Sequence, residues 1–242
     1  MKAELIDSMG SDLSVVNSAR VSFSKESEWD YIQSCCGNGS VHGCCGSPVM
    51  DQVLSEKDQK LIKYLTNHDH WTPFSHVMIT MRETVPIFVA RQRFKHMIGF
   101  TYNEVSRRYV DDPPEFYIPD KSKGLGWRLA PENMKQGSSG DAPVNTHFFA
   151  NNITRLIYKL AEKWYLYLVN VKGLAPEQAR MILPQGMLTS YYVTGSLAAW
   201  ARAYKLRIDP HAQKEIQDLA KQWDDIISDM PELKYSWAAL KS

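Results

Sequence analysis

The chain has 242 residues, of which 44% are hydrophobic and 23% charged, values that are ordinary for a globular protein. Its formal net charge of +1 argues against a nucleic-acid partner, because proteins dedicated to binding RNA or DNA usually carry a clear basic excess. No run approaches the roughly 18 consecutive apolar residues of a membrane-spanning helix, and the N-terminus lacks the apolar run of a signal peptide. We therefore expect no membrane partner and a cytoplasmic location, in the host cytoplasm if the source is a virus.

The N-terminal segment predicts a strand followed by a short helix. Residues 2–6 have the pattern of an edge strand, and Asp12 or Ser14 is suited to cap the helix that follows. We expect this helix to continue through Ala19, and we expect residues 21–23 to be extended.

Residues 33–50 are rich in glycine and serine, which is the composition of an inserted loop. The segment contains four cysteines and a histidine: Cys35, Cys36, Cys44, Cys45 and His42. Zinc sites usually separate paired cysteines by two residues, whereas the cysteines here are adjacent. We therefore predict reduced thiols and no metal, with a metal-binding or redox function as the alternative.

A capped helix and a strand lead into the middle of the chain. Ser55 and Asp58 resemble a capping box at the start of a helix. Apolar and polar residues alternate over 77–82, as they do in a strand with one buried face. Pro86 suits the first turn of a following helix, where its missing N–H is not needed.

The second half of the chain contains a long polar segment and a long helix. Residues 115–118 predict a strand. The polar stretch within 119–144 is too long for a simple connection, so we interpret it as a functional lid or a mobile insertion. Apolar residues then recur at helical spacing over 149–171, which predicts a long amphipathic helix.

The C-terminal third predicts one further strand, over 187–194, and a helix behind it, over 196–204. Asp209 and Pro210 have the pattern of an N-cap and a first helical residue, which predicts a last helix with a buried apolar stripe. Strands and helices that are segregated along the chain indicate the α+β class, with a mixed or antiparallel central sheet and flanking helices.

No internal repeat divides the chain, so we expect a single domain over residues 1–242 with inserted loops near 33–50 and 119–144. The glycine-rich nucleotide loops, the serine-hydrolase elbow and the HExxH zinc motif are absent from the sequence. Nothing in the sequence therefore supports a Rossmann cofactor site, P-loop chemistry or zinc hydrolysis.

Residues 86–109 carry many basic side chains around a glycine-containing turn: Arg91, Arg93, Lys95, Arg107 and Arg108. Arginine presents a planar pair of donors that matches phosphate, and Ser106 adds a hydroxyl at the end of the turn. Like charges at Arg91 and Lys95 repel on one helix face unless they face an anion or a carboxylate. We predict an anion-binding site, with surface salt bridges or a basic patch for RNA or DNA as alternatives.

Further motifs follow in order between residues 12 and 213. They are DLS at 12–14, ARVSF at 19–23, HDHWTPF at 68–74, PIFVARQ at 86–92, NEVSRRY at 103–109, EFYIP at 115–119, ARMILP at 179–184 and LRIDPHAQ at 206–213. On these motifs the chain resembles the flavin-dependent thymidylate synthases.

The resemblance implies a homotetramer whose active sites lie where subunits meet. It also implies the reductive methylation of dUMP to dTMP, which is de novo dTMP biosynthesis. Methylenetetrahydrofolate would be the carbon donor, NADPH the reductant and bound FAD the hydride carrier.

The resemblance assigns two sets of site residues. Those implied to bind dUMP are Gln92, Lys95, Glu104, Ser106, Arg107, Arg108, Arg180 and Arg207. Arg207 is the implied catalytic residue, because its charge would stabilise negative charge developing on the N3/O2 edge of the uracil. Those implied to contact FAD are Ser22, His70, Thr72, Lys95, His96, Glu104 and Arg202.

The chain departs from the family's Arg-His-Arg signature. It has Lys95-His96-Met97, followed by eight residues before Ser106. Lys95 keeps the charge but lacks the two parallel donors of arginine, and Met97 carries no charge, for which Arg202 is the candidate compensation. A weakened homologue that binds flavin or nucleotide without full turnover therefore stays open as an alternative, and so does a nucleic-acid-binding module.

Overall fold

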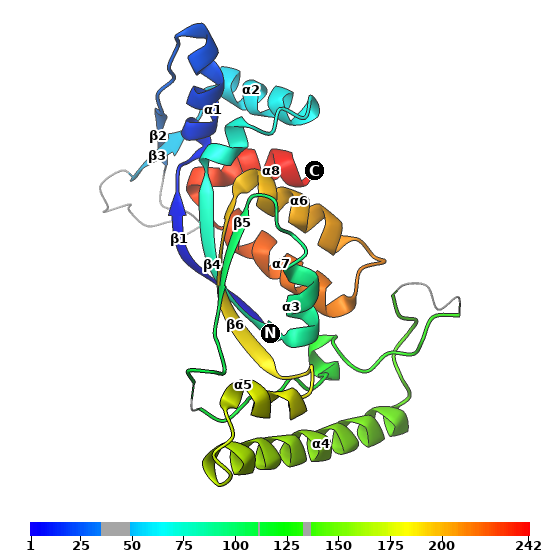
Figure 1. The fold of residues 1–242 in the computed structure, drawn as a ribbon. Coiled ribbons are helices and arrows are strands. Elements are labelled where there is room, and N and C mark those ends of the chain that lie inside the picture. The colour runs from blue at the N-terminus through cyan, green and yellow to red at the C-terminus, as the bar shows by residue number, and fades with distance from the viewer. Residues whose placement is uncertain (35–48, 111, 133–136) are drawn as a thin grey trace, which may run out of the picture.

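The structure is a computed structural model that describes residues 1–34, 49–110, 112–132 and 137–242 (Figure 1). Its larger sheet has the strand order β1–β4–β6–β5, and each neighbouring pair is antiparallel. The bounds are β1 (Lys2–Met9), β4 (Met78–Pro86), β6 (Leu188–Ser196) and β5 (Phe100–Glu104). The predicted strands at 2–6, 77–82 and 187–194 are confirmed, whereas β5 was not expected.

One face of the sheet is buried because apolar side chains alternate along its central strands. Ile79 and Met81 of β4 and Val193 of β6 are fully buried. Against them pack α6 (Leu197–Ile208) and α7 (Lys214–Ser228), which contribute the buried Trp200 and Trp223. The short turn η5 (Pro231–Leu233) and α8 (Lys234–Lys241) complete this layer (Figure 1).

The N-terminal helices lie at one end of the sheet. The N-cap of α1 (Asp12–Arg20) is Ser11 and not Asp12, and the predicted Ser14 completes the capping box by accepting a 3.0 Å hydrogen bond from the Ser11 N–H. The buried Asp12 carboxylate instead accepts hydrogen bonds of 2.8 Å from the backbone N–H groups of Tyr235 and Ser236, at the start of α8. A carboxylate is favourable there because helix N-termini leave N–H groups unpaired.

A tight helical turn and a second helix follow. Residues 21–23 form the 3-10 helix η1 (Val21–Phe23) rather than the predicted extended segment, because the end of α1 tightens into a last turn that Ser24 closes in the left-handed conformation. α2 (Glu56–Asn67) is capped by Ser55 as predicted, with the Ser55 hydroxyl accepting from the Asp58 N–H. η2 (Pro73–His76) then leads into β4.

The cysteine-containing segment is framed by a small two-stranded antiparallel sheet. Its strands are β2 (Asp30–Ser34) and β3 (Val49–Val53). The four cysteines and His42 lie outside the described residues. Within the described ranges, no group of three or more His, Cys, Asp or Glu side chains is placed to hold a metal, and no helix is long and apolar enough to cross a membrane.

The predicted polar insertion has defined contacts. Its described residues include the turn η3 (Lys121–Lys123) and a narrow hairpin, in which the backbones of Arg128 and Asp141 form an antiparallel bridge. Residues 115–118, predicted as a strand, make only a single bridge, from Phe116 to Met187.

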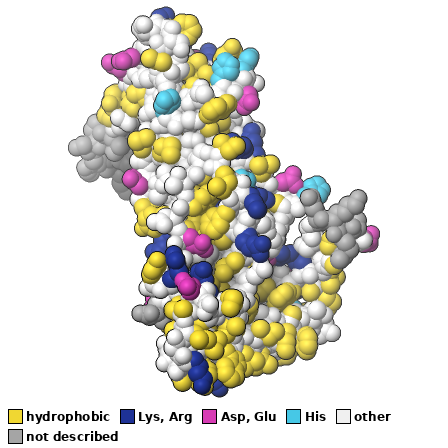
Figure 2. Space-filling model, in the orientation of Figure 1, with side chains coloured by type: hydrophobic (Ala, Val, Ile, Leu, Met, Phe, Trp, Pro, Cys, Tyr) yellow, Lys and Arg dark blue, Asp and Glu magenta, His cyan; other side chains and the backbone are white. Residues whose placement is uncertain are grey.

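The long predicted helix is α4 (Val144–Asn170), and it lies apart from the main helical layer (Figure 1). Much of its apolar face is exposed in the single chain, including Phe148, Phe149, Leu156, Ile157 and Trp164. Hydrophobic side chains gather over this region in Figure 2, whereas lysine and arginine side chains gather nearer the middle of the same view.

The last predicted helix begins later than expected. Asp209 accepts a 2.7 Å hydrogen bond from the His211 N–H, which closes a local turn, and α7 starts only at Lys214. Asp209 is therefore a turn residue here, because its short side chain captures the backbone two residues ahead.

Candidate active site

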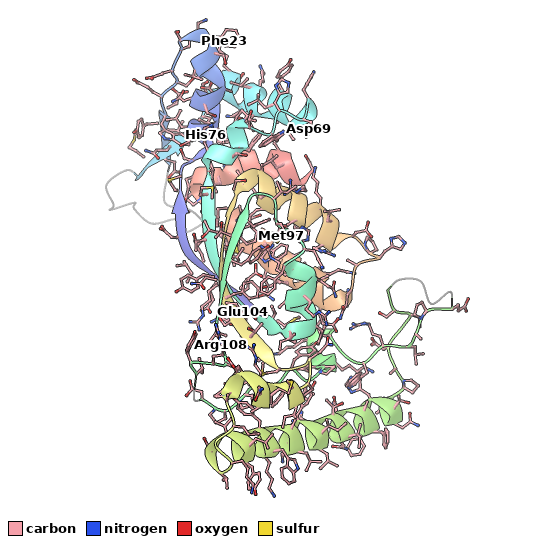
Figure 3. The ribbon with its side chains drawn as sticks, in the orientation of Figure 1. Phe23, Asp69, His76, Met97, Glu104 and Arg108 are labelled. Atoms are coloured by element: carbon pink, nitrogen blue, oxygen red, sulfur yellow. The ribbon has the colours of Figure 1, made fainter. Side chains whose placement is uncertain are left out.

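Nine of the predicted site residues line three clefts, which we call A, B and C. Cleft A holds Glu104, Ser106, Arg107 and Arg180, cleft B holds Gln92 and Arg207, and cleft C holds Ser22, His70 and Thr72. Figure 3 places Phe23 and Asp69, beside the cleft C residues, at one end of the chain, and Glu104 and Arg108 well away from them. The single chain therefore brings the residues together within each set but keeps cleft C apart from cleft A.

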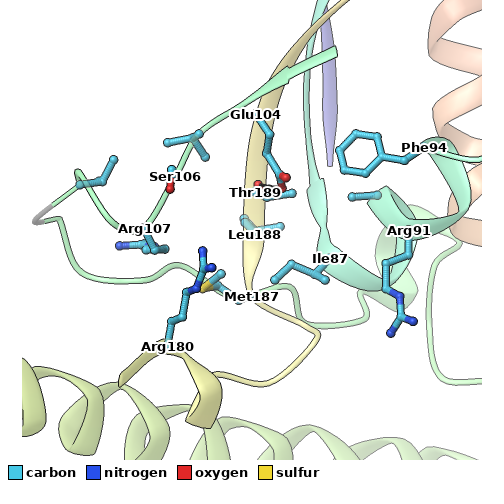
Figure 4. Close-up of a pocket in the computed structure, with 13 residues that line it drawn as sticks. Ile87, Arg91, Phe94, Glu104, Ser106, Arg107, Arg180, Met187, Leu188 and Thr189 are labelled. Atoms are coloured by element: carbon cyan, nitrogen blue, oxygen red, sulfur yellow. Dashed lines mark hydrogen bonds between the residues drawn. The ribbon is translucent and has the colours of Figure 1, made fainter. Parts of the chain in front are cut away.

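Cleft A has a volume of about 500 Å³ and lies between the end of β5, the start of β6 and α3 (Ile87–Arg93) (Figure 4). Its floor is apolar, with Ile87, Phe94 and Leu188. α5 (Pro176–Ala179) and the following turn η4 (Arg180–Ile182) close one side. An apolar floor with cations at its rim is suited to a flat ring that carries an anionic group.

Two arginines and a hydroxyl gather on one side of cleft A. Arg180 extends from η4 toward Arg107 in Figure 4, and Ser106 lies beside them. Arg107 donates to the backbone carbonyls of Asp112 and Pro113, and the Ser106 hydroxyl accepts a 3.3 Å bond from the Arg108 N–H. The predicted anion site is thus assembled from two distant parts of the sequence.

Glu104 is the acidic member of cleft A. Its carboxylate accepts a 2.6 Å hydrogen bond from the Thr189 hydroxyl across the β5–β6 pair. Thr189 is a buried cleft residue that the sequence did not single out. The sequence marked Thr189 only as part of a predicted strand. Its hydrogen-bond partner Glu104 ends β5, a strand that was not expected.

Arg93 does not belong to the anion site in which it was grouped. Its side chain is fully buried, and its Nε donates to both oxygens of the buried Glu83 at 3.2 Å. Its guanidinium carbon lies 4.4 Å from the ring centre of Phe100 and 4.7 Å from that of Trp223. A paired and enclosed guanidinium is a structural element of the core, because no face of it is left for a ligand.

The Arg93 network extends to the backbone of the signature residues. Arg93 Nη1 donates to the Tyr102 hydroxyl at 2.6 Å, and that hydroxyl lies 2.8 Å from the His96 carbonyl oxygen, to which it can donate. The turn that carries His96 is thereby attached to the core.

Cleft B contains the implied catalytic arginine in direct contact with the signature histidine. Arg207 Nε donates to His96 Nε2 at 2.7 Å, and Arg207 Nη2 donates to the Gln92 carbonyl at 3.3 Å. Partial burial and the nearby Arg93 charge lower the Arg207 pKa. The guanidinium remains a cation, since arginine in proteins stays protonated, and its charge is poorly solvated.

The His96 ring is neutral in this arrangement. Burial, and then the charges of Arg207, Arg93 and Arg202, lower the pKa of His96 from its ordinary 6.5 to about 4. A neutral ring nitrogen can accept from Arg207, whereas a protonated one cannot.

We expect the folded state to lose stability between pH 6.5 and about 4, because the unfolded chain takes up a proton at His96 that the folded chain does not. The His96 contribution is present above pH 6.5 and is lost as the pH falls. Urea unfolding at stepped pH measures it, and His96→Gln should flatten this part of the profile. An unchanged slope in His96→Gln would contradict the prediction, and the exposed His76→Gln is the matched control.

Cleft C lies at the opposite end and is lined by hydroxyls and aromatic rings. Ser22, His70 and Thr72 share it with the exposed Phe23, Tyr64 and Trp71. The Tyr64 ring stacks on His68 at 4.1 Å and meets His70 edge-on at 6.0 Å. This combination suits a planar, partly apolar group.

The remaining predicted residues lie at the surface of the single chain. Lys95 and Arg202 are exposed, and Arg202 donates to the Ile98 carbonyl. Met97 is 67% exposed and Arg108 is also exposed, with its guanidinium 5.1 Å from the Tyr109 ring centre. None of clefts A, B and C includes any of these four residues.

Comparison with known proteins identifies the family. The family model described as "Thymidylate synthase complementing protein" matches residues 4–231. A flavin-dependent thymidylate synthase from Thermotoga neapolitana is 34% identical over 218 residues, which cover 90% of this chain and 81% of that relative. This chain belongs to the flavin-dependent thymidylate synthase family.

Other flavin-dependent thymidylate synthases and a solved structure agree. A relative from Thermus thermophilus is 32% identical over 237 residues, covering 98% of this chain and 74% of that protein. The crystal structure of the UMP/dUMP methylase PolB from Streptomyces cacaoi, bound with 5-Br dUMP, matches with a TM-score of 0.78 and 26% identity, over 98% of this chain and 93% of that one. The expected family, and the architecture of an antiparallel sheet with flanking helices, are confirmed.

Proposed function

We propose that this chain methylates dUMP at an active site completed by more than one copy of the chain. Its family membership makes it a flavin-dependent thymidylate synthase, an enzyme that converts dUMP to dTMP with FAD, NADPH and methylenetetrahydrofolate. The observation that carries the composite site is that clefts A and C, which hold different parts of the predicted set, lie at different ends of the chain.

Cleft A suits the nucleotide. Arg107, Arg180 and the Ser106 hydroxyl would hold the phosphate, because guanidinium groups bind phosphate oxygens in pairs. The apolar floor of cleft A would accept the pyrimidine and sugar. Arg108 and Lys95, exposed in the single chain, would reach a nucleotide bound between copies.

Cleft B supplies the charge that the reaction needs. Arg207 would stabilise the negative charge that develops on the N3/O2 edge of the uracil, with no need for an enzyme nucleophile. The 2.7 Å bond to neutral His96 orients the Arg207 guanidinium. A cation that is held in place before the reaction stabilises the transition state most strongly where water is partly excluded. Arg207 meets this condition because it is partly buried.

Cleft C fits the flavin by the chemistry of its lining. Ser22 and Thr72 offer hydroxyls and His70 a ring nitrogen, while Phe23 and Trp71 leave exposed aromatic faces for a ring system. His96, Glu104 and Arg202 would contact the same cofactor from the other side of the composite site. When bound, FAD supplies the hydride transfer that no side chain can.

A homotetramer is the proposed assembly. It is supported by the apolar side chains that α4 leaves exposed, because an exposed patch of this kind marks an interaction site. Among the described residues, no helix covers the face of β4 and β6 opposite α6 and α7, and Arg82 and Tyr192 are exposed on that face. We further propose one domain over residues 1–242 and a cytoplasmic location.

A mixing experiment tests the composite site. His70→Ala/Thr72→Ala should inactivate cleft C, and Arg180→Ala should inactivate cleft A. Co-expressed with different tags and purified on both, the two inactive chains should regain dTMP synthesis, because some sites then take an intact cleft from each chain.

The control is a mixture of Arg180→Ala and Arg107→Ala chains, co-expressed with different tags and purified on both. Both substitutions lie in cleft A. Every chain in this mixture carries a damaged cleft A, so no composite site receives an intact one. This mixture should therefore regain less activity than the first. If His70→Ala/Thr72→Ala with Arg180→Ala regains none, each site is made by one chain and the composite site is wrong.

A further inference from the structure

A tyrosine of β5 connects the buried Arg93–Glu83 pair to the turn that carries His96. Arg93 Nη1 lies 2.6 Å from the Tyr102 hydroxyl oxygen. Arginine can only donate hydrogen bonds, so this oxygen must accept one, and the hydroxyl hydrogen is left for a carbonyl. Two carbonyl oxygens are within reach, that of His96 at 2.8 Å and that of Arg93 at 3.2 Å. The shorter contact assigns the hydrogen to His96, so Tyr102 holds the backbone of the turn.

The same turn is packed against α6. Gly99 lies in this turn with a φ of +79°, and a Cβ added there would lie 2.8 Å from the Cβ of Ala199. The Gly99 carbonyl accepts a 3.1 Å hydrogen bond from the N–H of Ser196, the N-cap of α6. Arg207 is in the last turn of α6. The turn is therefore held between Tyr102 and the helix that carries Arg207.

The Arg207 guanidinium depends on this turn for its position. In the described part of the chain it makes two hydrogen bonds, one to the His96 ring at 2.7 Å and one to the Gln92 carbonyl at 3.3 Å. Both acceptors belong to residues 92–96, which are the end of α3 and the start of the turn. An arginine side chain has many rotamers, so acceptors at fixed positions are needed to keep its charged group in one orientation.

We infer that Tyr102 is a positioning residue for Arg207, because its hydroxyl holds the His96 backbone and the His96 ring in turn holds the guanidinium. This rests on the proposed function, in which Arg207 stabilises negative charge on the uracil. The buried ion pair provides the fixed end, since both of its side chains are fully enclosed in a close-packed core. The complete path from the core to cleft B is Glu83, Arg93, Tyr102, His96 and Arg207.

Tyr102→Phe tests this role because it removes the hydroxyl and keeps the ring. The ring centre lies 5.1 Å from that of Phe94 and 6.0 Å from that of Tyr191, both edge-on, and phenylalanine can keep these contacts. The turn then loses a donor and can shift relative to Arg207. We expect kcat for dTMP formation to fall about tenfold, because displacing a catalytic group by about 1 Å can cost up to about 100-fold.

The titration of His96 is a second readout, and it needs no turnover. Burial and the charges of Arg207, Arg93 and Arg202 hold the His96 pKa at about 4. In Tyr102→Phe the ring should gain water and move away from Arg207, so its pKa should rise toward the ordinary 6.5. Nuclear magnetic resonance of 13C-labelled histidine rings in the purified full-length chain measures this pKa, and His96→Gln identifies the signal.

Tyr191→Phe is the matched control. The Tyr191 hydroxyl donates to Glu83 Oε2 at 2.5 Å, so this variant removes the same group from the same buried network, at the end away from His96. It should lower the melting temperature, as Tyr102→Phe does, because each change leaves a buried charged group with one partner fewer. It should keep the His96 pKa near 4 and the wild-type kcat.

A second background separates this role from the stability of the core. In an Arg93→Met/Glu83→Gln chain, Tyr102→Phe leaves no arginine unpaired, and it should still raise the His96 pKa relative to that double variant. A His96 pKa that Tyr102→Phe leaves unchanged in both backgrounds, or that Tyr191→Phe raises as much, would overturn the inference. A wild-type chain that forms no dTMP would overturn the proposed function, and the His96 titration would still decide whether Tyr102 holds His96 against Arg207.

Discussion

Arg207→Ala should lower the dUMP-dependent rate of dTMP formation by about 100- to 1,000-fold, because removing one preorganised donor raises the barrier by about 3–4 kcal/mol. The Arg207 guanidinium is partly buried, and its hydrogen bonds to His96 and to the Gln92 carbonyl hold it in place. Flavin absorbance and the melting temperature should stay near wild type. Steady-state kinetics at saturating dUMP measure the effect.

Two further variants test whether the loss of rate comes from the charge and the donors of Arg207. Arg207→Lys keeps a charge but lacks the second donor, so it should recover only part of the rate. Lys221→Ala, which removes an exposed cation on α7, should leave the rate unchanged. An Arg207→Ala enzyme that turns over dUMP within threefold of wild type would show that Arg207 is not the catalytic cation.

Arg93→Met should destabilise the fold by about 3–5 kcal/mol, because it leaves the Glu83 carboxylate buried without its partner. For a chain of this length the melting temperature should drop by about 10 °C or more. Of its partners in the described part of the chain, Glu83 would keep the Tyr191 hydroxyl, which donates a hydrogen bond to it. Thermal unfolding followed by circular dichroism measures the change.

A second substitution should relieve that loss. Glu83→Gln added to Arg93→Met removes the unpaired charge and keeps an acceptor for Tyr191, so the double variant should melt above the single one. Lys221→Met, at an exposed position of α7, should change stability by less than about 0.5 kcal/mol. If Arg93→Met, like this control, melted within about 2 °C of wild type, the buried Arg93–Glu83 pair would not hold the core as described.

Local patterns predicted the sheet and helices where they were strong. The alternation over 77–82 and the apolar spacing of the long helix reappear as β4 and α4. β5 was missed because Phe100–Glu104 follows a glycine turn and is mostly exposed, which leaves no alternation to detect. The start of α7 was misplaced because an Asp-Pro pair can close a turn as readily as it caps a helix.

The site could be predicted from the sequence only as a set of residue types. Arg207 and His96 are 111 positions apart, so their 2.7 Å contact depends on how α6 packs beside the signature turn. Arg93 was misassigned because nothing in the sequence pairs it with Glu83, which lies ten residues earlier on β4. Gln213 was part of a matching motif, but only the structure connects it to Glu215 and Arg128.

The altered signature makes the rate of catalysis the point to measure. Lys95 and Met97 replace the two arginines of the family signature, and both side chains are exposed in the single chain. We expect these changes to alter the affinity for dUMP and FAD, because Arg207, His96 and Gln92 contact one another without using either side chain.

The most direct test is dTMP formation by the purified chain with FAD, dUMP, methylenetetrahydrofolate and NADPH, followed by chromatography together with NADPH oxidation. A flavin-dependent thymidylate synthase should form about one dTMP for each NADPH oxidised in the absence of oxygen, and none without dUMP. Bound flavin and NADPH oxidation with no dTMP would contradict the account and indicate a homologue that has kept the cofactor site and lost methyl transfer.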